Sequence, residues 1–287
     1  MALDVRELNA AMTGRPNGLP AATSHQHRTE TPIMYHLPSL LLSSAMVFGF
    51  VTLPSGAALA DVKNIVLVHG ANVDGSTWRD VYDRLTAEDY KVTVAQMPLT
   101  STEADIAAVQ RIVDVQDGPM LLVGHSYGGI VITEVGADPD VRGLVYIAAF
   151  QPDVGESGGG LLASNPGEFS PDMLTVFDDG HYLIHEDGFL TVVGNGLSDQ
   201  DAIFVARSQA ASNASILEFQ TQSAAWVEKP SWSVIATLDR TITPDLQRQM
   251  SQRAGSTVEE VENGHMLPMT NPNEVADVIR QAAEAVE

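Results

Sequence analysis

A serine stands between two glycines in the segment Gly124-His125-Ser126-Tyr127-Gly128, directly after the apolar run 120–123. A serine on a sharp turn from a strand into a helix is a nucleophile elbow. The glycines suit such a turn because a Cβ would clash where strand and helix approach closely. The serine could also do no more than tighten the turn. The apolar strand before it and the helical pattern after it favour a nucleophile, whose hydroxyl attacks once a base removes its proton.

An acid and a base follow later in the chain, each at the end of an apolar run. Asp239 follows the run 232–238, and His265 follows the run 257–261. A histidine can take the serine proton, and a buried carboxylate can hold the imidazole in one tautomer. The order serine, acid, histidine is the one expected on an elbow architecture. Asp245 is the rival acid, one helical turn further on. The other histidines are less suited as bases, because they fall in the N-terminal leader (His25, His27, His36), in the loop and elbow backbone (His69, His125) or in an insertion (His181, His185).

A tetrahedral intermediate at Ser126 needs two N–H donors for its oxyanion. The backbone of Tyr127, at the start of the helix after the serine, is one candidate. The backbone of Ala71 is the other, because it follows His69-Gly70 at the end of the apolar run 64–68. We expect both to lie at the carboxyl edge of the sheet, where parallel α/β sheets bind ligands.

The rest of the chain alternates strand and helix signals, which predicts an α/β fold with a mostly parallel sheet flanked by helices. The expected strands are 64–68, 91–96, 120–123, 141–150, 232–238 and 257–261, and the expected helices are 78–87, 100–115, 127–135, 244–254 and 273–285.

The alternation breaks at residue 151, where glycines, prolines and short apolar patches begin. We therefore expect three folded segments: the first part of the core (61–150), a cap insertion (151–225) and the second part of the core (226–287). A cap over the carboxyl edge of the sheet would enclose an apolar pocket. The expected pocket residues are Phe150, Leu161, Phe169, Phe189, Trp226 and Met266.

Residues 1–60 form an expected leader. An apolar run from Leu37 to Leu53 precedes the small-residue triplet Ala58-Leu59-Ala60, which predicts a secretory signal peptide cleaved after Ala60. A single membrane anchor is the alternative, but the run contains serines and is short for a span. Met34 is an alternative start of the natural chain. The expected location is periplasmic or secreted, without stable membrane association after cleavage.

The formal net charge of −22 argues against nucleic acid or an anionic membrane surface as partner. Adaptation to salty surroundings is one hypothesis for this acidity. Cysteine is absent, which excludes disulfides and thiolate metal sites. No spacing of histidines and carboxylates fits a metal site, and the glycine pairs do not form a dinucleotide or phosphate loop, so we expect neither a metal nor a cofactor.

Several segments together resemble the α/β-hydrolase superfamily, in the compact branch of plant salicylate-methyl-ester esterases, hydroxynitrile lyases and bacterial esterase-like members. The similar segments are Val68-His69-Gly70-Ala71 with Trp78, Gly124 to Gly129, Thr237-Leu238-Asp239-Arg240 with Pro244 and Gln247, and Gly264-His265-Met266. The resemblance extends over roughly residues 62–286. It implies the α/β-hydrolase fold, with a small cap after the sixth-strand position of that family. It also implies a triad of Ser126, His265 and Asp239, with an oxyanion hole at Ala71 and Tyr127.

Two positions separate the branches of this superfamily. The similar lyases carry a lysine directly after the catalytic histidine and a hydroxylated residue in the oxyanion loop, whereas this chain has Met266 and Gly70. We therefore expect a serine carboxylesterase for small to medium hydrophobic esters, acting through an acyl-enzyme. A hydroxynitrile lyase, a carbon–carbon bond hydrolase with the same triad, and a ligand-binding protein that has lost catalysis are the alternatives. The sequence leaves the oligomeric state open.

Overall fold

The computed structural model describes residues 62–286. The predicted leader and its cleavage site after Ala60 lie outside the described residues. None of the helices within 62–286 is long and apolar enough to cross a membrane.

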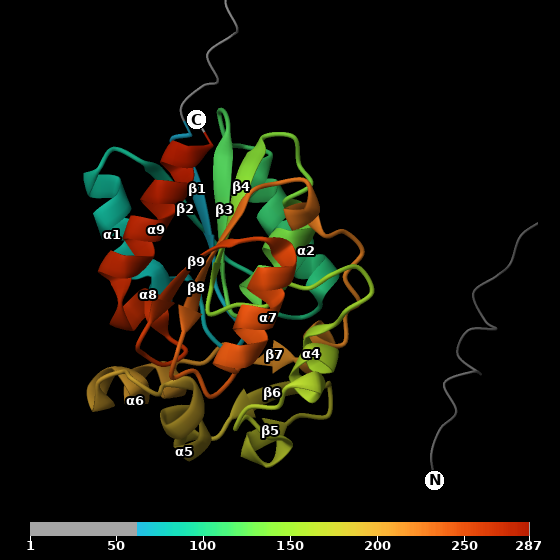
Figure 1. Cartoon of the computed structure of the whole chain (residues 1–287). Coiled ribbons are helices and arrows are strands. Elements are labelled where there is room, and N and C mark those ends of the chain that lie inside the picture. Colours follow the sequence, from blue (N-terminus) through green and yellow to red (C-terminus); the bar gives the residue numbers. More distant parts are fainter. Residues whose placement is uncertain (1–61, 287) are drawn as a thin grey trace, which may run out of the picture. The chain divides into compact units, whose positions relative to one another are not determined.

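A six-stranded sheet forms the centre of the fold, with the strand order β2-β1-β3-β4-β8-β9 (Figure 1). All neighbouring strands in it run parallel. The α/β prediction from alternating strands and helices is therefore confirmed. The strands are β1 (Asn64–Val68), β2 (Lys91–Ala95), β3 (Met120–His125), β4 (Val141–Ile147), β8 (Ser231–Ala236) and β9 (Thr257–Val261).

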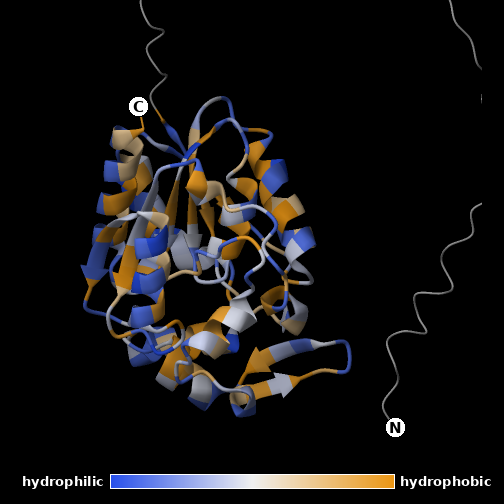
Figure 2. Ribbon diagram, turned by 45° about the vertical axis from the view of Figure 1, so that its right-hand side comes forward, coloured by the Kyte–Doolittle hydropathy of each residue, from blue (hydrophilic) through white to orange (hydrophobic). Residues whose placement is uncertain are grey.

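Helices cover both faces of this sheet. On one face α1 (Arg79–Ala87) and α9 (Pro272–Ala285) pack together, with the short α8 (Leu267–Thr270) beside them. On the other face lie α2 (Thr102–Val113), α3 (Gly128–Val135) and α7 (Pro244–Ala254). Because the sheet is covered on both faces, its central strands are hydrophobic, whereas the surrounding helices alternate hydrophobic and hydrophilic residues (Figure 2).

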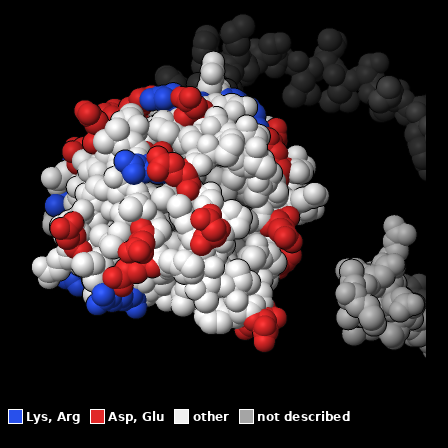
Figure 3. All heavy atoms as spheres, turned by 90° about the horizontal axis from the view of Figure 1, so that it is seen from below, with Lys and Arg blue, Asp and Glu red and all other residues white. Residues whose placement is uncertain are grey.

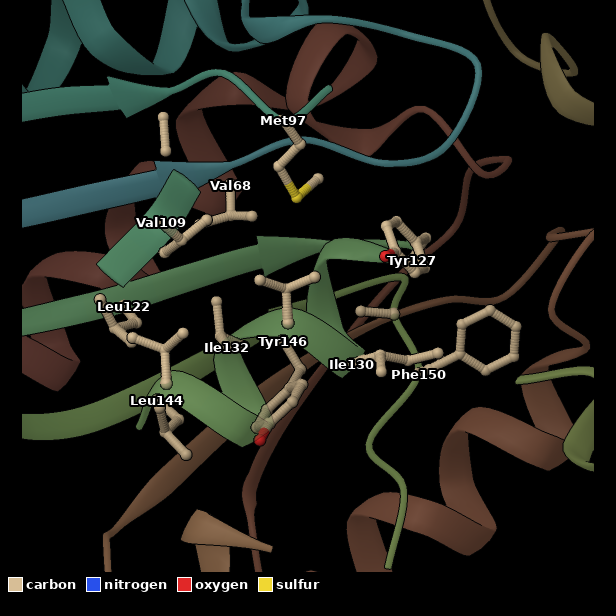
Figure 4. Packing of buried hydrophobic residues seen from close by; sticks show 14 of the residues in the cluster. Val68, Met97, Val109, Leu122, Tyr127, Ile130, Ile132, Leu144, Tyr146 and Phe150 are labelled. Atoms are coloured by element: carbon tan, nitrogen blue, oxygen red, sulfur yellow. The ribbon is translucent and has the colours of Figure 1, made fainter. Parts of the chain in front are cut away.

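Alternate residues of each central strand pack into opposite layers of the core. In β1, Val66 and Val68 contact the layer of α2 and α3, whereas Ile65 and Leu67 contact the layer of α1 and α9. Because both faces are buried, these strands read in the sequence as continuous apolar runs. Figure 4 shows the first layer, in which side chains of the strands and of α3 pack together, among them Val68, Leu122, Leu144 and Ile132.

The chain between β4 and β8, residues 148–230, contains the segment 151–225 that the sequence predicted as a cap, and the name cap is used below for all of it. In Figure 1 most of it lies below the sheet. Its centre is an antiparallel sheet of three strands in the order β5-β6-β7. A hydrophobic cluster joins Tyr182 and Phe189 of the cap to Met266 of the core. The cap consists of α4 (Gly158–Ser164), η3 (Pro171–Met173), β5 (Leu174–Val176), β6 (His181–Ile184), α5 (Glu186–Gly188), the π-helical η4 (Phe189–Val193), α6 (Asp199–Arg207), β7 (Ser212–Asn213), η5 (Ala214–Leu217) and η6 (Ala225–Val227).

Some element ends differ from the expected ones for local reasons. The strand expected at 141–150 ends at Ile147, because Ala148 has a φ of +43° and Phe150 then donates its N–H to the Ser126 carbonyl at 3.2 Å. The helix expected from residue 100 begins at Thr102, because the Ser101 hydroxyl accepts from the Ala104 N–H at 3.2 Å and so caps it.

Candidate active site

Ser126 occupies a tight turn between β3 and α3. Its φ is +54°, in the left-handed region, and the residue is buried. A Cβ on Gly124 would lie 2.7 Å from the Gly128 carbonyl oxygen, and a Cβ on Gly128 would lie 2.6 Å from the His69 carbonyl oxygen. The spacing of the two glycines therefore follows from how closely the strand, the turn and the helix approach one another.

The structure brings Ser126, His265 and Asp239 together in one hydrogen-bonded chain. His265 Nδ1 lies 2.7 Å from Asp239 Oδ2, and His265 Nε2 lies 2.9 Å from Ser126 Oγ. Because a carboxylate can only accept, Nδ1 carries the ring proton and Nε2 accepts from the serine hydroxyl. His265 and Asp239 are almost completely buried. This arrangement can pass the hydroxyl proton to the imidazole as Oγ attacks a carbonyl carbon.

Four hydrogen bonds hold the Asp239 carboxylate. Oδ1 accepts from the backbone N–H groups of Thr241 at 2.8 Å and Ile242 at 3.1 Å. Oδ2 accepts from His265 and from the Gln247 side-chain amide at 2.8 Å. The same amide group donates to the Ile242 carbonyl, and its oxygen accepts from the Ala236 N–H. The carboxylate is therefore fixed in orientation as well as in position. The rival acid, Asp245, pairs instead with Arg248 at the surface.

Two backbone amides beside Ser126 have the right surroundings to bind an oxyanion. Ala71 and Tyr127 both line the cavity that contains Ser126. Among residues 62–286, neither backbone N–H donates a hydrogen bond. Backbone donors that stay unpaired at a nucleophile are available for the negative charge of a tetrahedral intermediate.

His69 fixes the peptide that carries the Ala71 N–H. Its Nε2 accepts from the Met97 N–H at 3.0 Å, so the ring proton lies on Nδ1, which donates to the Gly70 carbonyl at 2.8 Å. Because N–H and C=O of a trans peptide point in opposite directions, this bond aims the Ala71 N–H away from His69. Burial lowers the pKa of His69, which favours the neutral ring that the two bonds require.

His125 holds the backbone of His265. Its Nε2–H donates to the His265 carbonyl at 3.0 Å, and the two rings lie 4.9 Å apart between centroids. Burial and the neighbouring His265 ring lower the pKa of His125 well below its usual range, which keeps it neutral. His69 and His125 therefore position backbone atoms of the site.

The side chain of Tyr127 anchors the elbow in the core (Figure 4). Its hydroxyl donates to Asp105 Oδ2 at 2.8 Å and lies 3.1 Å from the Thr102 hydroxyl, both on α2. Asp105 Oδ1 also accepts from the Leu99 N–H at 2.8 Å. Burial raises the pKa of Asp105, because its carboxylate lies in the protein interior and an ionised group is disfavoured there.

The loops after β1 and β2 connect the site to the cap. Asn72 has a φ of +59°, its N–H donates to the Ser212 hydroxyl at 2.9 Å, and its side-chain amide donates to the Tyr182 carbonyl at 3.2 Å. Leu99, with a φ of +57°, accepts at its carbonyl from the Asn213 N–H at 2.8 Å. The loops after β1 and β2 are therefore joined to strands β6 and β7 by hydrogen bonds.

The cavity at Ser126 and the open space at its mouth together have a volume of about 460 Å³. Its wall has no lysine, arginine, aspartate or glutamate among the described residues. Phe150 and Phe169, two of the expected pocket residues, lie in this wall. The other apolar side chains in the wall are Leu162, Ile184, Val193 and Leu217.

Four expected pocket residues do not line this cavity. Leu161 points into the core from α4, so its neighbour Leu162 takes the place at the cavity. Phe189 and Met266 are fully buried in the cluster between cap and core. Trp226 packs against the core and donates its indole N–H to the Pro152 carbonyl at 2.7 Å. An apolar residue type in the sequence does not distinguish a side chain that packs in the interior from one that lines a cavity, because both places need apolar side chains.

Gln247 and Asp105 are two residues of the site region whose roles were not predicted from the sequence. The signal for Gln247 was its place eight residues after Asp239, in the first turns of the helix that follows. The signal for Asp105 was a carboxylate among apolar residues of an amphipathic helix. Among residues 62–286, no group of three or more histidine or acidic side chains is arranged to hold a metal ion.

Comparisons with known proteins agree with this architecture. A family model described as "Alpha/beta hydrolase family" matches residues 65–278. The alpha/beta hydrolase nvfD of Aspergillus novofumigatus is 26% identical over 249 residues, which cover 78% of this chain and 98% of that protein. A carbendazim hydrolyzing esterase of Nocardioides sp. is 36% identical over 136 residues, 42% of this chain and 54% of the esterase.

Solved structures share the fold at low sequence identity. The pyrethroid hydrolase of Sphingobium faniae superimposes with a TM-score of 0.67 and 21% identity, covering 78% of this chain and 98% of that chain. Tomato methylketone synthase I superimposes with a TM-score of 0.68 and 14% identity, covering 79% of this chain and 99% of that chain. The family match spans both parts of the core and the segment between them, and this chain therefore belongs to the alpha/beta hydrolase family.

Proposed function

We propose that this protein is a serine carboxylesterase that hydrolyses small to medium hydrophobic esters through an acyl-enzyme. The observation that carries the proposal is the buried chain of hydrogen bonds from Ser126 through His265 to Asp239. In the proposed reaction Ser126 Oγ attacks the ester carbonyl and His265 takes its proton. His265 then gives this proton to the leaving alcohol, and water repeats the sequence to release the acid.

The proposed oxyanion hole consists of the Ala71 and Tyr127 N–H groups, whose lack of other partners supports this role. The apolar, uncharged wall of the cavity supports a neutral, hydrophobic substrate. The names of two similar proteins also support an ester hydrolase. The esterase from Nocardioides is named for carbendazim and the hydrolase from Sphingobium for pyrethroids.

The surroundings of Gly70 support hydrolysis over the lyase alternative. A Cβ at this position would lie 2.9 Å from Ser126 Cβ and 3.4 Å from Ser126 Oγ. A hydroxylated residue there, as in the similar lyases, would crowd the nucleophile. Met266, where those lyases have lysine, is fully buried in the cluster between cap and core and offers no charge to a cyanide leaving group.

The test is hydrolysis of p-nitrophenyl esters from acetate to dodecanoate by wild type and Ser126→Ala. We expect wild-type turnover with an optimum chain length set by the cavity, and a loss of at least about a thousandfold in the variant. Cyanide release from a cyanohydrin without ester turnover would favour the lyase. Binding of an ester without any turnover would favour the non-catalytic protein.

We also propose that the chain is exported, on the strength of the signal peptide predicted to end at Ala60. Expression of the full chain in a bacterial host and N-terminal sequencing of the exported protein test this. The expected mature N-terminus is Asp61, whereas an uncleaved chain retained inside the cell would contradict the proposal.

A further inference from the structure

Strand β6 of the cap contributes one wall of the cavity at Ser126. Tyr182 and Ile184, two residues apart and therefore on the same face of the strand, both line it. The Tyr182 carbonyl accepts from the side chain of Asn72, which directly follows the proposed oxyanion donor Ala71. Tyr182 is thus held against the proposed oxyanion loop by a hydrogen bond as well as by packing.

The Tyr182 hydroxyl lacks a hydrogen-bond partner within residues 62–286, although only 3% of the residue is exposed. The two other almost fully buried tyrosines differ, since Tyr127 bonds Asp105 and Tyr146 bonds Thr133 at 2.9 Å. Buried tyrosine hydroxyls usually find a partner, because leaving one unpaired costs free energy. Burial raises the pKa of Tyr182 to about 12, so the hydroxyl remains a donor at neutral pH.

A second hydroxyl in the wall of the cavity is also unpaired. Thr241 lines the cavity from the core side, and its Oγ1 has no hydrogen-bond partner in the described part of the chain. Its backbone N–H is fixed by Asp239 Oδ1, so the residue sits in the rigid loop that carries the proposed catalytic acid. The wall of the cavity therefore includes two residues whose hydroxyls have no hydrogen-bond partner among residues 62–286, Tyr182 from the cap and Thr241 from the core.

We propose that the Tyr182 hydroxyl, assisted by that of Thr241, binds a second oxygen of the substrate, so that the enzyme selects neutral esters that carry a carbonyl or ether oxygen besides the scissile ester. This inference rests on the proposed esterase function and deepens it. Among residues 62–286, no lysine or arginine lines the cavity to balance a carboxylate, which makes an uncharged acceptor the matching group. A site built to bond a substrate oxygen discriminates more strongly than a purely apolar one.

The test compares p-nitrophenyl levulinate with p-nitrophenyl pentanoate, which have the same chain length but differ by a ketone oxygen. Further pairs move the ketone along longer acyl chains. Each ratio of kcat/KM is divided by the ratio of the alkaline hydrolysis rates, which removes the intrinsic reactivity of the ester. For wild type we expect a preference of about tenfold for the keto ester at the best position.

Tyr182→Phe should abolish this preference, because phenylalanine keeps the ring and lacks only the hydroxyl. Thr241→Val should reduce the preference in part. Tyr146→Phe is the matched control, because it removes a buried hydroxyl away from the cavity and should leave the preference intact. Inhibition of wild-type pentanoate hydrolysis by matched keto and saturated amides gives a second readout that does not depend on the folding of a variant.

The inference would be overturned if wild type showed the same corrected kcat/KM for keto and saturated esters, and the same inhibition by keto and saturated amides, at every ketone position. It would also be overturned if Tyr182→Phe kept the full preference for the keto ester. In both cases continued pentanoate hydrolysis that depends on Ser126 would leave the esterase function standing. Absence of turnover for every ester would contradict both proposals.

Discussion

At the scale of single residues, catalysis by the proposed triad depends on how Asp239 is held against His265. Gln247 donates to the carboxylate from the first turns of α7 and also bonds two backbone groups. Gln247→Ala would leave these buried groups without partners. We therefore expect kcat to fall by roughly tenfold with little change in KM, and the free energy of unfolding to fall by about 1–3 kcal/mol.

Gln252→Ala is the matched control for Gln247, because it removes an exposed glutamine from the same helix. It should change neither kcat nor the free energy of unfolding. Steady-state kinetics and urea unfolding of both variants measure the effect. A Gln247→Ala variant that loses stability but keeps the wild-type kcat would show that Gln247 supports the fold without positioning the acid.

Asp105 gives a prediction about pH. Burial raises its pKa above the ordinary value of about 3.9, so the folded state binds its proton more tightly than the unfolded state. Its contribution to stability is therefore full below about pH 3.9 and is lost as the pH rises through the folded-state pKa. Asparagine does not titrate. The free energy of unfolding of Asp105→Asn, measured relative to that of wild type, should therefore increase as the pH rises. The increase should be about 1.4 kcal/mol for each unit by which the pKa of Asp105 is raised.

Urea unfolding of wild type and Asp105→Asn at a series of pH values from about 4 to 8 measures this difference. Asparagine keeps an acceptor for the Leu99 N–H, so the hydrogen bond to the loop after β2 is retained. A difference between the two proteins that stays constant with pH would contradict a raised pKa at this position.

The residues that could be predicted from the sequence are those whose residue type and position after an apolar run together indicate a chemical role. Ser126, Asp239 and His265 each follow an apolar run, and the structure brings them within hydrogen-bond distance. Gln247 and Asp105 could not be assigned in the same way, because glutamine and aspartate are ordinary on helices. Their roles depend on segments that meet only after folding, such as α2 against the elbow.

At the scale of elements, α3 and the chain after β4 approach each other closely. A Cβ on Gly129 would lie 2.0 Å from the Phe150 carbonyl oxygen, which is backbone and cannot move aside. Gly129→Ala should therefore displace the N-terminus of α3 and with it Ser126. We expect the free energy of unfolding to fall by about 3 kcal/mol and kcat/KM to fall with it.

Gly160→Ala tests whether the effect comes from this contact. Gly160 is also in the first turn of a helix, α4, but it is exposed, and its added Cβ would meet only the Ser157 hydroxyl at 3.2 Å. Alanine there should raise the stability by up to about 1 kcal/mol through helix propensity. Thermal unfolding and ester hydrolysis compare the two variants. Similar behaviour of both would refute the packing argument.

The predictability of the elements follows their burial. Strands covered on both sides appear as apolar runs, and the prediction of 257–261 and of 244–254 matches β9 and α7 to the residue. The cap was predicted only as a segment, because its helices and strands are short and lack a clear period. Leu161 and Leu162 are neighbours in α4, and only the orientation of the helix decides which one reaches the cavity.

At the scale of the whole molecule, acidic side chains dominate the charge. The chain has 37 acidic and 15 basic residues, and the face seen in Figure 3 shows separate groups of acidic atoms with few basic ones. Repulsion among them opposes the folded state, and salt screens it over a Debye length of about 10 Å at 0.1 M. The melting temperature should therefore rise with sodium chloride from about 0.01 to 0.5 M.

Differential scanning calorimetry at constant pH measures this dependence. Potassium chloride at the same ionic strength should act equally, because screening does not depend on the identity of the cation. A melting temperature that falls or stays constant would show that the surface ion pairs, such as Arg248 with Glu260, outweigh the repulsion.

The central claim, that Ser126 is an activated nucleophile, is tested most directly by covalent labelling with diethyl p-nitrophenyl phosphate. We expect one equivalent of p-nitrophenolate to be released and the intact mass to show one diethylphosphoryl adduct. Peptide mapping should place this adduct on the peptide that contains Ser126. Ser126→Ala should remain unmodified, and His265→Ala should react at least about a hundredfold more slowly. Wild type without an adduct, or an adduct that forms equally in Ser126→Ala, would contradict the account.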